Sequence, residues 1–265
     1  MVLSAEAYDR FFQKHSRSLL VLGEQVQKRI LESTFVIAGL GAVGTPLFEI
    51  LVRIGIGKII IIDPDRKVED HNLDRQFLYR EEDVGKPKVL AAKENALEIN
   101  SDVQVISYVG RFSDALESSL FESIKRSDII FSAIDNRLGR YSVARFCYAF
   151  NIPHIDGTTG GYNCRAFIFP EPRKGPCYLC TLTRKDYEEI SKNFSCTRRE
   201  NTGFIAPAIV QTGVQVADIM AMEAIKILSG KIPEYNEIRV NLEDWSLMKE
   251  KIDPSEGHRW WHVIG

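Results

Sequence analysis

The sequence predicts an α/β fold with a doubly wound, mostly parallel sheet. The first half of the chain alternates short apolar strands with helical segments. A glycine-rich turn, Gly39 to Gly44, joins the first of these strands to the helix that follows it. Strand–helix–strand repetition at this spacing produces right-handed crossovers, and these build an open parallel sheet covered by helices.

The elements of the first half follow one another in a regular order. The run 58–63 contains four consecutive isoleucines, which is typical of a parallel strand buried on both faces. Roughly the first 30 residues have the apolar spacing of helices. After them we expect strands at 35–38, 58–63, 103–109 and 128–133, and helices at about 43–54, 87–99 and 116–125.

The pattern changes after Pro153. Glycines and prolines interrupt the chain there and separate short strands such as 165–169. A long helix is expected at about 206–228, followed by a strand near 238–242 and a polar tail. The second half of this α/β fold is therefore expected to be irregular.

The composition excludes several classes of protein. With 265 residues, 45% of them hydrophobic, the chain is long enough for one large domain with a buried core. A formal net charge of −2 indicates no general attraction to nucleic acid or to membrane surfaces. The N-terminus lacks the apolar core of a signal peptide, and no apolar run is long enough to span a membrane. We therefore expect a soluble, cytoplasmic protein.

The glycine-rich turn has the pattern G-x-G-x-x-G and is formed by Gly39, Gly41, Ala42 and Gly44. Between a strand and a helix, this pattern lets the backbone approach phosphate groups, and the helix N-terminus adds unpaired N–H groups. Asp63 ends the next strand, where a carboxylate can accept hydrogen bonds from ribose. A Rossmann-like nucleotide site follows, although the motif alone does not distinguish ATP from NAD.

The residues after the second strand favour a triphosphate. Arg75 and Lys88 lie on the segments that follow this strand and would neutralise the charge of a leaving pyrophosphate. Asp135, followed by Asn136, comes after another strand, at the edge where ligands bind to parallel sheets. A carboxylate there suits Mg²⁺. A site for hydride transfer would need none of these groups.

These motifs, in this order, resemble the MoeB/ThiF/HesA family, the prokaryotic relatives of ubiquitin-activating enzymes. The resemblance covers about residues 17–242. It rests on GLGAVG, on IIIIDPD with Asp63 and Asp65, on NLDRQ, on GKPK and on AIDN, and it continues through CRAFIFPEPRKGPCYLC and GVQVADIMAMEAIKILSG. The element NLDRQ with its downstream lysine is specific to the family, whereas the glycine turn is not.

The resemblance implies roles for individual residues. Asp63 would bind ribose, and Asn72, Arg75 and Lys88 would bind the phosphates of ATP. Asp65 and Asn136 would also line the nucleotide site. Asp135 would hold magnesium. Arg17 matches an arginine that reaches the nucleotide of the neighbouring subunit, which implies a homodimer with two composite sites.

The resemblance also implies the reaction. The C-terminal carboxylate of a ubiquitin-like sulfur-carrier protein, usually after Gly-Gly, would attack the α-phosphate of ATP and form an acyl adenylate. The carboxylate is already ionised at neutral pH, so catalysis requires positioning and charge stabilisation rather than a strong base. We expect the sulfur donor to be a separate protein, because the sequence leaves no room for a rhodanese domain.

A zinc site is expected in the second half. Cys177 and Cys180 have zinc-knuckle spacing, but the second C-x-x-C pair of the family is missing, because no cysteine follows Cys196. We propose His258 and His262 as the other two ligands, since two thiolates and two imidazoles satisfy tetrahedral zinc. Zinc bound without the histidines, or a loop without metal, are the alternatives.

Cys196 lies near the place where some family members carry a reactive cysteine. The neighbouring arginines Arg198 and Arg199 would favour its thiolate. The distance to the following glycine does not match the family, so a catalytic role for Cys196 is a hypothesis rather than a motif match. An exposed or structural cysteine is the alternative.

We expect the chain to form a single domain and consider three other functions for it. One adenylation domain would span 1–265, with a helical segment at 1–30, a nucleotide-binding half at 31–156 and a substrate and zinc half at 157–265. The substrate could instead be the C-terminus of a ribosomal peptide. A non-catalytic subunit that binds a ubiquitin-like protein is a further alternative, and an NAD-dependent dehydrogenase would leave Arg75, Lys88 and Asp135 unexplained.

Overall fold

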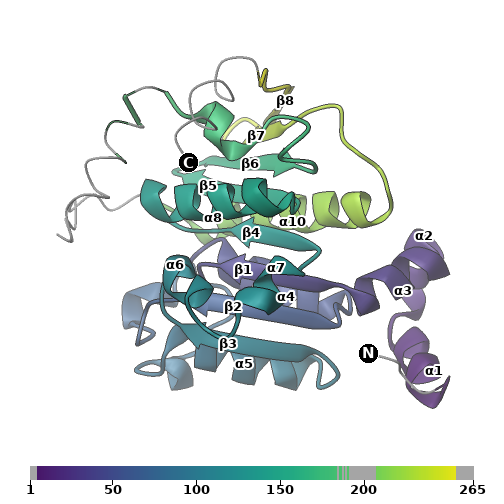
Figure 1. Ribbon diagram of the computed structural model, residues 1–265. Coiled ribbons are helices and arrows are strands. Elements are labelled where there is room, and N and C mark those ends of the chain that lie inside the picture. Colours follow the sequence, from purple (N-terminus) through teal and green to yellow (C-terminus); the bar gives the residue numbers. More distant parts are fainter. Residues whose placement is uncertain (1–4, 184, 187, 189, 191–206, 255–265) are drawn as a thin grey trace.

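The computed structural model describes residues 5–254 except 184, 187, 189 and 191–206. Within these residues one sheet of eight strands forms the centre of the molecule, in the order β3-β2-β1-β4-β5-β6-β7-β8 (Figure 1). The first five strands in this order run parallel to one another. Their bounds are β1 (Thr34–Ala38), β2 (Lys58–Asp63), β3 (Gln104–Val109), β4 (Ile129–Ser132) and β5 (His154–Gly160).

The strand order reverses at β1. From β1 the chain adds β2 and β3 on one side, and it then returns to add β4 and β5 on the other side. In open α/β sheets, ligands bind at the carboxyl ends of the strands beside such a reversal. The loops after β1 and β4 therefore frame the expected site.

Three antiparallel strands extend the sheet beyond β5. They are β6 (Asn163–Phe169), β7 (Glu237–Asn241) and β8 (Ser246–Glu250), and each pairs with the strand before it in the sheet. The sequence-based prediction named the strands corresponding to β6 and β7 but neither β5 nor β8. Asp156 and two glycines interrupt the apolar pattern of β5 and hide its strand character, and β8 is largely exposed.

Helices cover both faces of the sheet, as Figure 1 shows. Alternate residues of β1 point to opposite faces, and both sets are buried: Phe35 and Ile37 on one side, Val36 and Ala38 on the other. The first face packs against α3 (Glu24–Glu32), α4 (Gly44–Arg53), α5 (Lys88–Ile99) and α10 (Val210–Leu228), and the second against α6 (Phe112–Leu116), α7 (Phe121–Lys125) and α8 (Arg137–Phe150).

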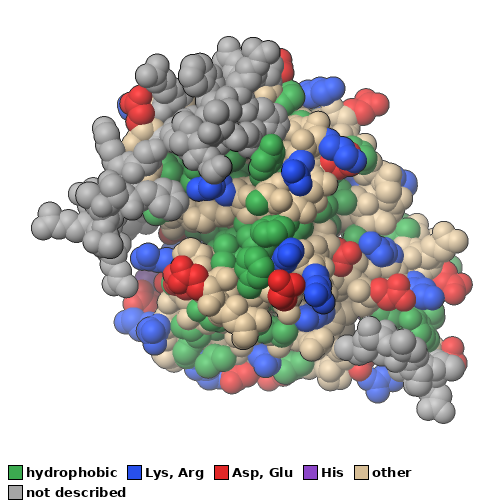
Figure 2. Space-filling view, in the orientation of Figure 1, with side chains coloured by type: hydrophobic (Ala, Val, Ile, Leu, Met, Phe, Trp, Pro, Cys, Tyr) green, Lys and Arg blue, Asp and Glu red, His purple; other side chains and the backbone are tan. Residues whose placement is uncertain are grey.

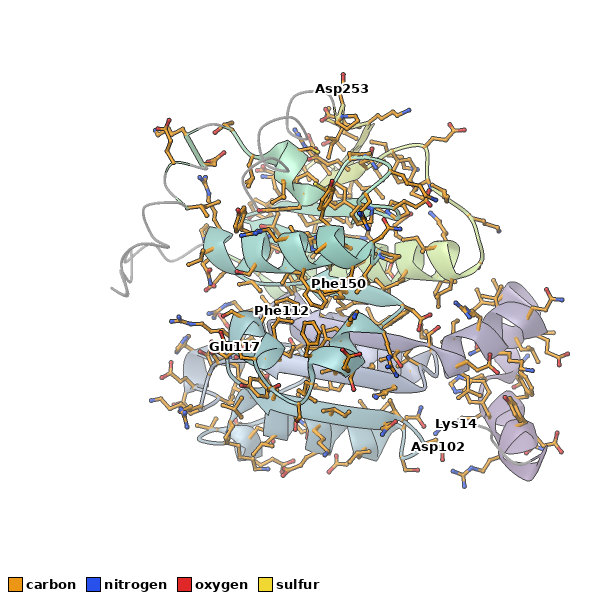
Figure 3. The ribbon with its side chains drawn as sticks, in the orientation of Figure 1. Lys14, Asp102, Phe112, Glu117, Phe150 and Asp253 are labelled. Atoms are coloured by element: carbon orange, nitrogen blue, oxygen red, sulfur yellow. The ribbon has the colours of Figure 1, made fainter. Side chains whose placement is uncertain are left out.

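The second face carries an aromatic cluster, in which Phe112 and Phe146 are buried and Phe150 is partly exposed. The ring of Phe146 lies 5.7 Å from that of Phe112 and 4.7 Å from that of Phe150. Figure 2 shows an apolar area at the centre of this face, and Figure 3 places Phe112 and Phe150 there. Charged side chains of both signs surround it, in keeping with the nearly balanced net charge.

The N-terminal helical region consists of three helices. These are α1 (Ala5–Lys14), α2 (Ser16–Leu22) and α3, and the last two are separated by Gly23, whose φ of 80° ends α2. The first of these helices contacts the segment before β3. Lys14 Nζ lies 2.5 Å from Asn100 Oδ1 and close to Asp102 (Figure 3).

The predicted fold class is confirmed. The sheet is mostly parallel, with a reversal of strand order at β1, and it is covered on both faces. Among the residues that the structure describes, no helix is long and apolar enough to cross a membrane.

Candidate nucleotide site

The turn after β1 packs with almost no space around its backbone. A Cβ atom on Gly39, whose φ is 97°, would lie 2.4 Å from the carbonyl oxygen of Ala133. A Cβ on Gly44 would lie 1.9 Å from the carbonyl oxygen of Gly39. From α10, Gly213 approaches equally closely, since its Cβ would lie 2.2 Å from the carbonyl oxygen of Ala42. The turn is therefore fixed between β4 and α10.

Gly41 faces open space instead. A Cβ on Gly41 would have no protein atom within 4 Å, and its φ lies outside the left-handed region. Below it, the Thr45 backbone N–H and hydroxyl both donate to the Gly41 carbonyl oxygen, at 3.1 and 2.8 Å. The turn thus has an open side above the start of α4, which fits a phosphate group approaching a helix N-terminus.

Asp63 links the turn to the end of β2. Its Oδ2 accepts a hydrogen bond of 2.6 Å from the Leu40 N–H, and its Oδ1 accepts one of 2.9 Å from the Asp65 N–H. Burial raises the pKa of this carboxyl, and the positive charge of Lys88 opposes that shift. Asp63 therefore supports the glycine turn and still has lone pairs for ribose hydroxyls.

Lys88 is a buried cation at the first residue of α5. Its Nζ lies 2.6 Å from Asp65 Oδ2, and its backbone N–H donates to the Asp65 carbonyl oxygen at 3.2 Å. The Lys88 side chain is 7% exposed, whereas that of Asp65 is 56% exposed. A buried ammonium requires a partner, and an exposed carboxylate is a partner that a more highly charged anion can replace.

The NLDRQ element forms the short helix η1 (Asp70–Asn72) and the residues after it. Asn72 is buried, and its Oδ1 accepts from the Glu69 N–H at 3.0 Å. Arg75 is partly exposed, and its Nη1 donates to Asp74 Oδ1 at 2.8 Å and to the His71 carbonyl oxygen. Asn72 thus fixes the segment that presents Arg75.

Asp135 and Asn136 lie between β4 and α8. Asn136 caps this helix, because its Oδ1 accepts from the Gly139 N–H at 2.8 Å. Asp135 is exposed, and it forms no ion pair within the described part of the chain. An exposed carboxylate without a cationic partner fits the donor chemistry that Mg²⁺ prefers.

Two groups at this edge were not predicted from the sequence. The first is Tyr79, whose buried hydroxyl lies 3.3 Å from the carbonyl oxygens of both Leu40 and Lys88. It ties the glycine turn to the start of α5. Only its place soon after NLDRQ could have indicated this role, because a tyrosine in an apolar segment is more often a core residue.

The second group is a buried network between β4, β5 and α8. Asp156, wholly buried on β5, accepts from Ser132 on β4 and from Arg140 on α8, and Ser132 Oγ lies 2.9 Å from His154 Nε2. No local signal marked this network, because Asp156 lies in a strand that the sequence did not predict.

Arg17 lies near the amino ends of the parallel strands, whereas the site lies at their carboxyl ends. It is exposed on α2, and the helices on either side of α2 are anchored to segments that precede strands: Lys14 to Asn100 before β3, and Arg29 to Asp128 before β4. In Figure 1 these helices lie to the right, and α6, which follows β3, lies to the left. Within one chain, Arg17 therefore stands apart from Arg75, Lys88 and Asp135.

The two cysteines of the C-x-x-C motif lie together. Cys177 directly precedes the short helix η3 (Tyr178–Thr181), Cys180 lies within it, and their Sγ atoms are 3.8 Å apart. The Cys180 sulfur and burial raise the pKa of Cys177. Within the described residues, no group of three or more His, Cys, Asp or Glu side chains could hold a metal ion. The expected ligands His258 and His262 lie outside these residues, as does Cys196.

The fold and this sheet edge define a nucleotide-binding α/β protein of the Rossmann type. A model of the ThiF family matches residues 15–258, and the chain belongs to the ThiF family. This confirms the family that the motifs predicted.

Three relatives are named as adenylyltransferases. The chain is similar to the sulfur carrier protein ThiS adenylyltransferase of Escherichia coli strain K12, with 29% identity over 88% of this chain and 87% of that protein. It is 31% identical to the sulfur carrier protein adenylyltransferase of Thermus thermophilus, over 85% and 79% of the two chains. With the ThiS adenylyltransferase of Bacillus subtilis strain 168, identity is 37% over 79% of this chain and 58% of that one. The predicted class, an ATP-dependent adenylyltransferase, is confirmed.

Solved structures show the same fold. A crystal structure of E. coli MccB with ATP superposes with a TM-score of 0.75 at 22% identity, over 96% of this chain and 80% of that one. PaaA superposes with a TM-score of 0.73 at 23% identity, over 95% and 84%. At this level of identity, the likeness concerns the fold alone.

Replacing Gly41 with alanine tests the open side of the turn. Gly41→Ala should leave the thermal unfolding temperature unchanged or slightly raised, because the new Cβ meets no protein atom and the unfolded chain becomes less flexible. Affinity for ATP should fall by about tenfold or more, equivalent to about 1.4 kcal/mol, because the methyl group occupies the space above the turn. Calorimetric titration with ATP measures this.

Gly175→Ala is the matched control. Its Cβ would meet only an ordinary contact, 3.7 Å from the Glu171 carbonyl oxygen. This variant should bind ATP as the unmodified protein does. Unchanged ATP affinity in Gly41→Ala would contradict the assignment of this space to phosphate.

Proposed function

We propose that this protein uses ATP to activate the C-terminal carboxylate of a ubiquitin-like sulfur-carrier protein as an acyl adenylate. The observation that carries the proposal is the gathering of the glycine turn, Lys88 and Asp135 at one edge of the sheet, beside the reversal of strand order. The names of the relatives support the kind of substrate.

The reaction requires little covalent chemistry from the protein. An oxygen of the carrier's carboxylate forms a bond to the α-phosphorus of ATP. The bond from that phosphorus to the bridging oxygen breaks, and pyrophosphate leaves with the electron pair. Arg75 and Lys88 would stabilise the negative charge that moves onto the leaving group, because fixed cations in a partly dry site act more strongly than they do in water.

Lys88 would change partner when ATP binds. In the structure it neutralises Asp65, a largely exposed carboxylate. A triphosphate offers a higher negative charge at the same edge, so the ammonium would turn to the phosphates and Asp65 would be left to solvent. Asp63 would accept from the ribose hydroxyls, with its other contacts to the turn retained.

Magnesium would bind at Asp135, whose exposed carboxylate fits it. The ion supplies charge neutralisation on the phosphate oxygens. The chain's own contribution is to hold this carboxylate at the carboxyl end of β4, next to the capped start of α8.

We further propose a homodimer in which Arg17 completes the site of the neighbouring subunit. Arg17, Leu20 and Val21 share one face of α2, and the two apolar residues are 79% and 84% exposed. Apolar side chains exposed this far gain free energy from burial against a partner. Because Arg17 stands at the wrong edge of its own sheet, it can serve a site only in trans.

The sulfur donor would be a separate protein, and the acyl adenylate would be the species it attacks. Adenylation of a ribosomal peptide remains as the rival proposal. The following assay separates the two substrates, because only adenylation of the carrier requires a ubiquitin-like partner for exchange.

ATP–pyrophosphate exchange tests the function. With Mg²⁺ and a panel of small proteins ending in Gly-Gly, the protein should incorporate labelled pyrophosphate into ATP only with its cognate carrier. Arg75→Ala should lower the exchange rate on the order of 100-fold, because it removes a cation from the developing charge. Exchange driven by a short peptide alone would favour the peptide substrate, and no exchange with any partner despite ATP binding would contradict the proposed carrier substrate.

Mixed variants test the composite site in the same assay. Arg17→Ala and Arg75→Ala should each have little activity alone, and an equal mixture that exchanges subunits should regain about a quarter of full activity. Half of the dimers would then be mixed, and one of the two sites in each would be intact. No recovery on mixing would contradict the contribution of Arg17 in trans.

We also propose a zinc site at the C-x-x-C motif. Tetrahedral zinc with Zn–S bonds of about 2.3 Å places two thiolate sulfurs about 3.8 Å apart, and the Sγ atoms of Cys177 and Cys180 are separated by 3.8 Å. We propose these two thiolates as ligands, together with His258 and His262.

Metal analysis of the purified protein tests the zinc site. We expect about one zinc per chain, lost in Cys177→Ser and in His258→Ala. Cys164→Ala is the control, because this buried cysteine lies on β6, away from the motif. A zinc-free wild-type protein would contradict the site, and zinc retained in His258→Ala would remove that histidine from the ligand set.

A further inference from the structure

The network beneath Asp135 is a buried chain of hydrogen bonds. His154, Ser132 and Asp156 are each at most 1% exposed, and Ser132 and Asp156 are direct neighbours in the β4–β5 ladder. Ser132 Oγ lies 2.9 Å from His154 Nε2 and donates to Asp156 Oδ2. Arg140 Nη1 donates to Asp156 Oδ1.

These bonds permit only one arrangement of protons. The hydroxyl of Ser132 has a single proton, which goes to the carboxylate, so His154 must carry its proton on Nε2 and donate to Ser132. Burial and the charge of Arg140 lower the pKa of His154 to about 3, which keeps the ring neutral at physiological pH. Arg140 and Asp156 therefore form the charged pair of a network that is otherwise neutral.

Arg140 extends this network to the backbone beside Asp135. Its Nε donates to the Ile134 carbonyl oxygen at 2.6 Å, and its Nη2 donates to the Gly157 carbonyl oxygen at 3.1 Å. The guanidinium also contacts the Tyr178 hydroxyl, on the segment between the two cysteines. One side chain thus joins the ends of β4 and β5 to the C-x-x-C segment.

The contact to Ile134 bears directly on Asp135. The carbonyl of Ile134 and the N–H of Asp135 belong to one planar peptide unit, so holding that oxygen fixes the plane that ends at the Asp135 Cα. The Asp135 side chain itself has only a long contact of 3.4 Å, from Asn136 Nδ2, within the described residues. The backbone anchor therefore fixes the position from which this carboxylate extends.

We propose that Arg140 is a positioning residue, which holds Asp135 in place for the metal–nucleotide complex through the Ile134–Asp135 peptide, with Asp156 as its counter-ion. The proposal rests on the proposed role of Asp135 in ATP binding. A buried ion pair is seldom retained for stability alone, because apolar replacements are often equally stable, and a fixed backbone beside the site gives this pair a function.

The informative variant removes both charges together. Arg140→Met combined with Asp156→Leu fills similar volumes without leaving an unpaired buried charge, so the protein should stay folded. Arg140→Lys is the second variant, since a lysine can pair with Asp156 but lacks the fork that reaches both backbone oxygens. Arg145→Met is the control, because this exposed arginine of the same helix packs on Tyr141 instead.

Two measurements need no catalytic activity. In the ligand-free protein, the backbone amides of residues 133–136 should exchange with deuterium about tenfold faster in both Arg140 variants than in the control. With a non-hydrolysable ATP analogue bound, Mn²⁺ affinity measured by electron paramagnetic resonance should fall about 10- to 100-fold. Nucleotide affinity without metal should stay within about twofold, because Arg140 is placed on the metal side of the site.

The outcomes separate this inference from the proposed function. Wild-type amide exchange and Mn²⁺ affinity in a folded double variant would overturn the positioning role. Asp135→Asn with unchanged Mn²⁺ affinity would overturn it as well, since Asp135 would then hold no metal. Weakened Mn²⁺ binding in the Arg140 variants would support the inference even if no carrier protein elicits pyrophosphate exchange, in which case only the proposed substrate fails.

Discussion

The close backbone contact between the turn after β1 and the end of β4 is the constraint on which the site depends. Gly39 meets the Ala133 carbonyl so closely that no side chain fits, and Gly213 of α10 excludes a side chain against Ala42 in the same way. With two sides of the turn closed, Gly41 is left facing open space. The same contact fixes the distance from the turn to Asp135, two residues after Ala133.

The cations at the nucleotide site pair with carboxylates that a bound ligand can replace. Lys88 is buried but pairs with an exposed carboxylate, and Arg75 pairs with its neighbour Asp74. Deeper in the molecule, Arg140 and Asp156 are both buried. Exposed pairs contribute little to stability and can be exchanged for a ligand, whereas breaking a buried pair is costly. The first kind suits binding, and the second suits a fixed frame.

Much of this architecture could be predicted from the sequence, because its signals are local. The isoleucine run of β2 and the glycine turn each determine their own structure, and the order of motifs placed Lys88 and Asp135 at one edge. The Arg140 network could not be predicted in this way. Its members come from β4, β5 and α8, and only the folded register brings Ser132 opposite Asp156. The strand β5 was missed for a related reason, since its aspartate and glycines are held in the strand by the neighbouring strands rather than by their own propensity.

The most direct test of this account is a crystal structure with Mg²⁺ and a non-hydrolysable ATP analogue. The account predicts phosphate oxygens above Gly41, the Lys88 ammonium turned from Asp65 to the phosphates, and the metal at Asp135. It also predicts that Arg140 keeps its contact with the Ile134 carbonyl. A nucleotide bound elsewhere, or Lys88 still paired with Asp65 beside a bound triphosphate, would contradict it.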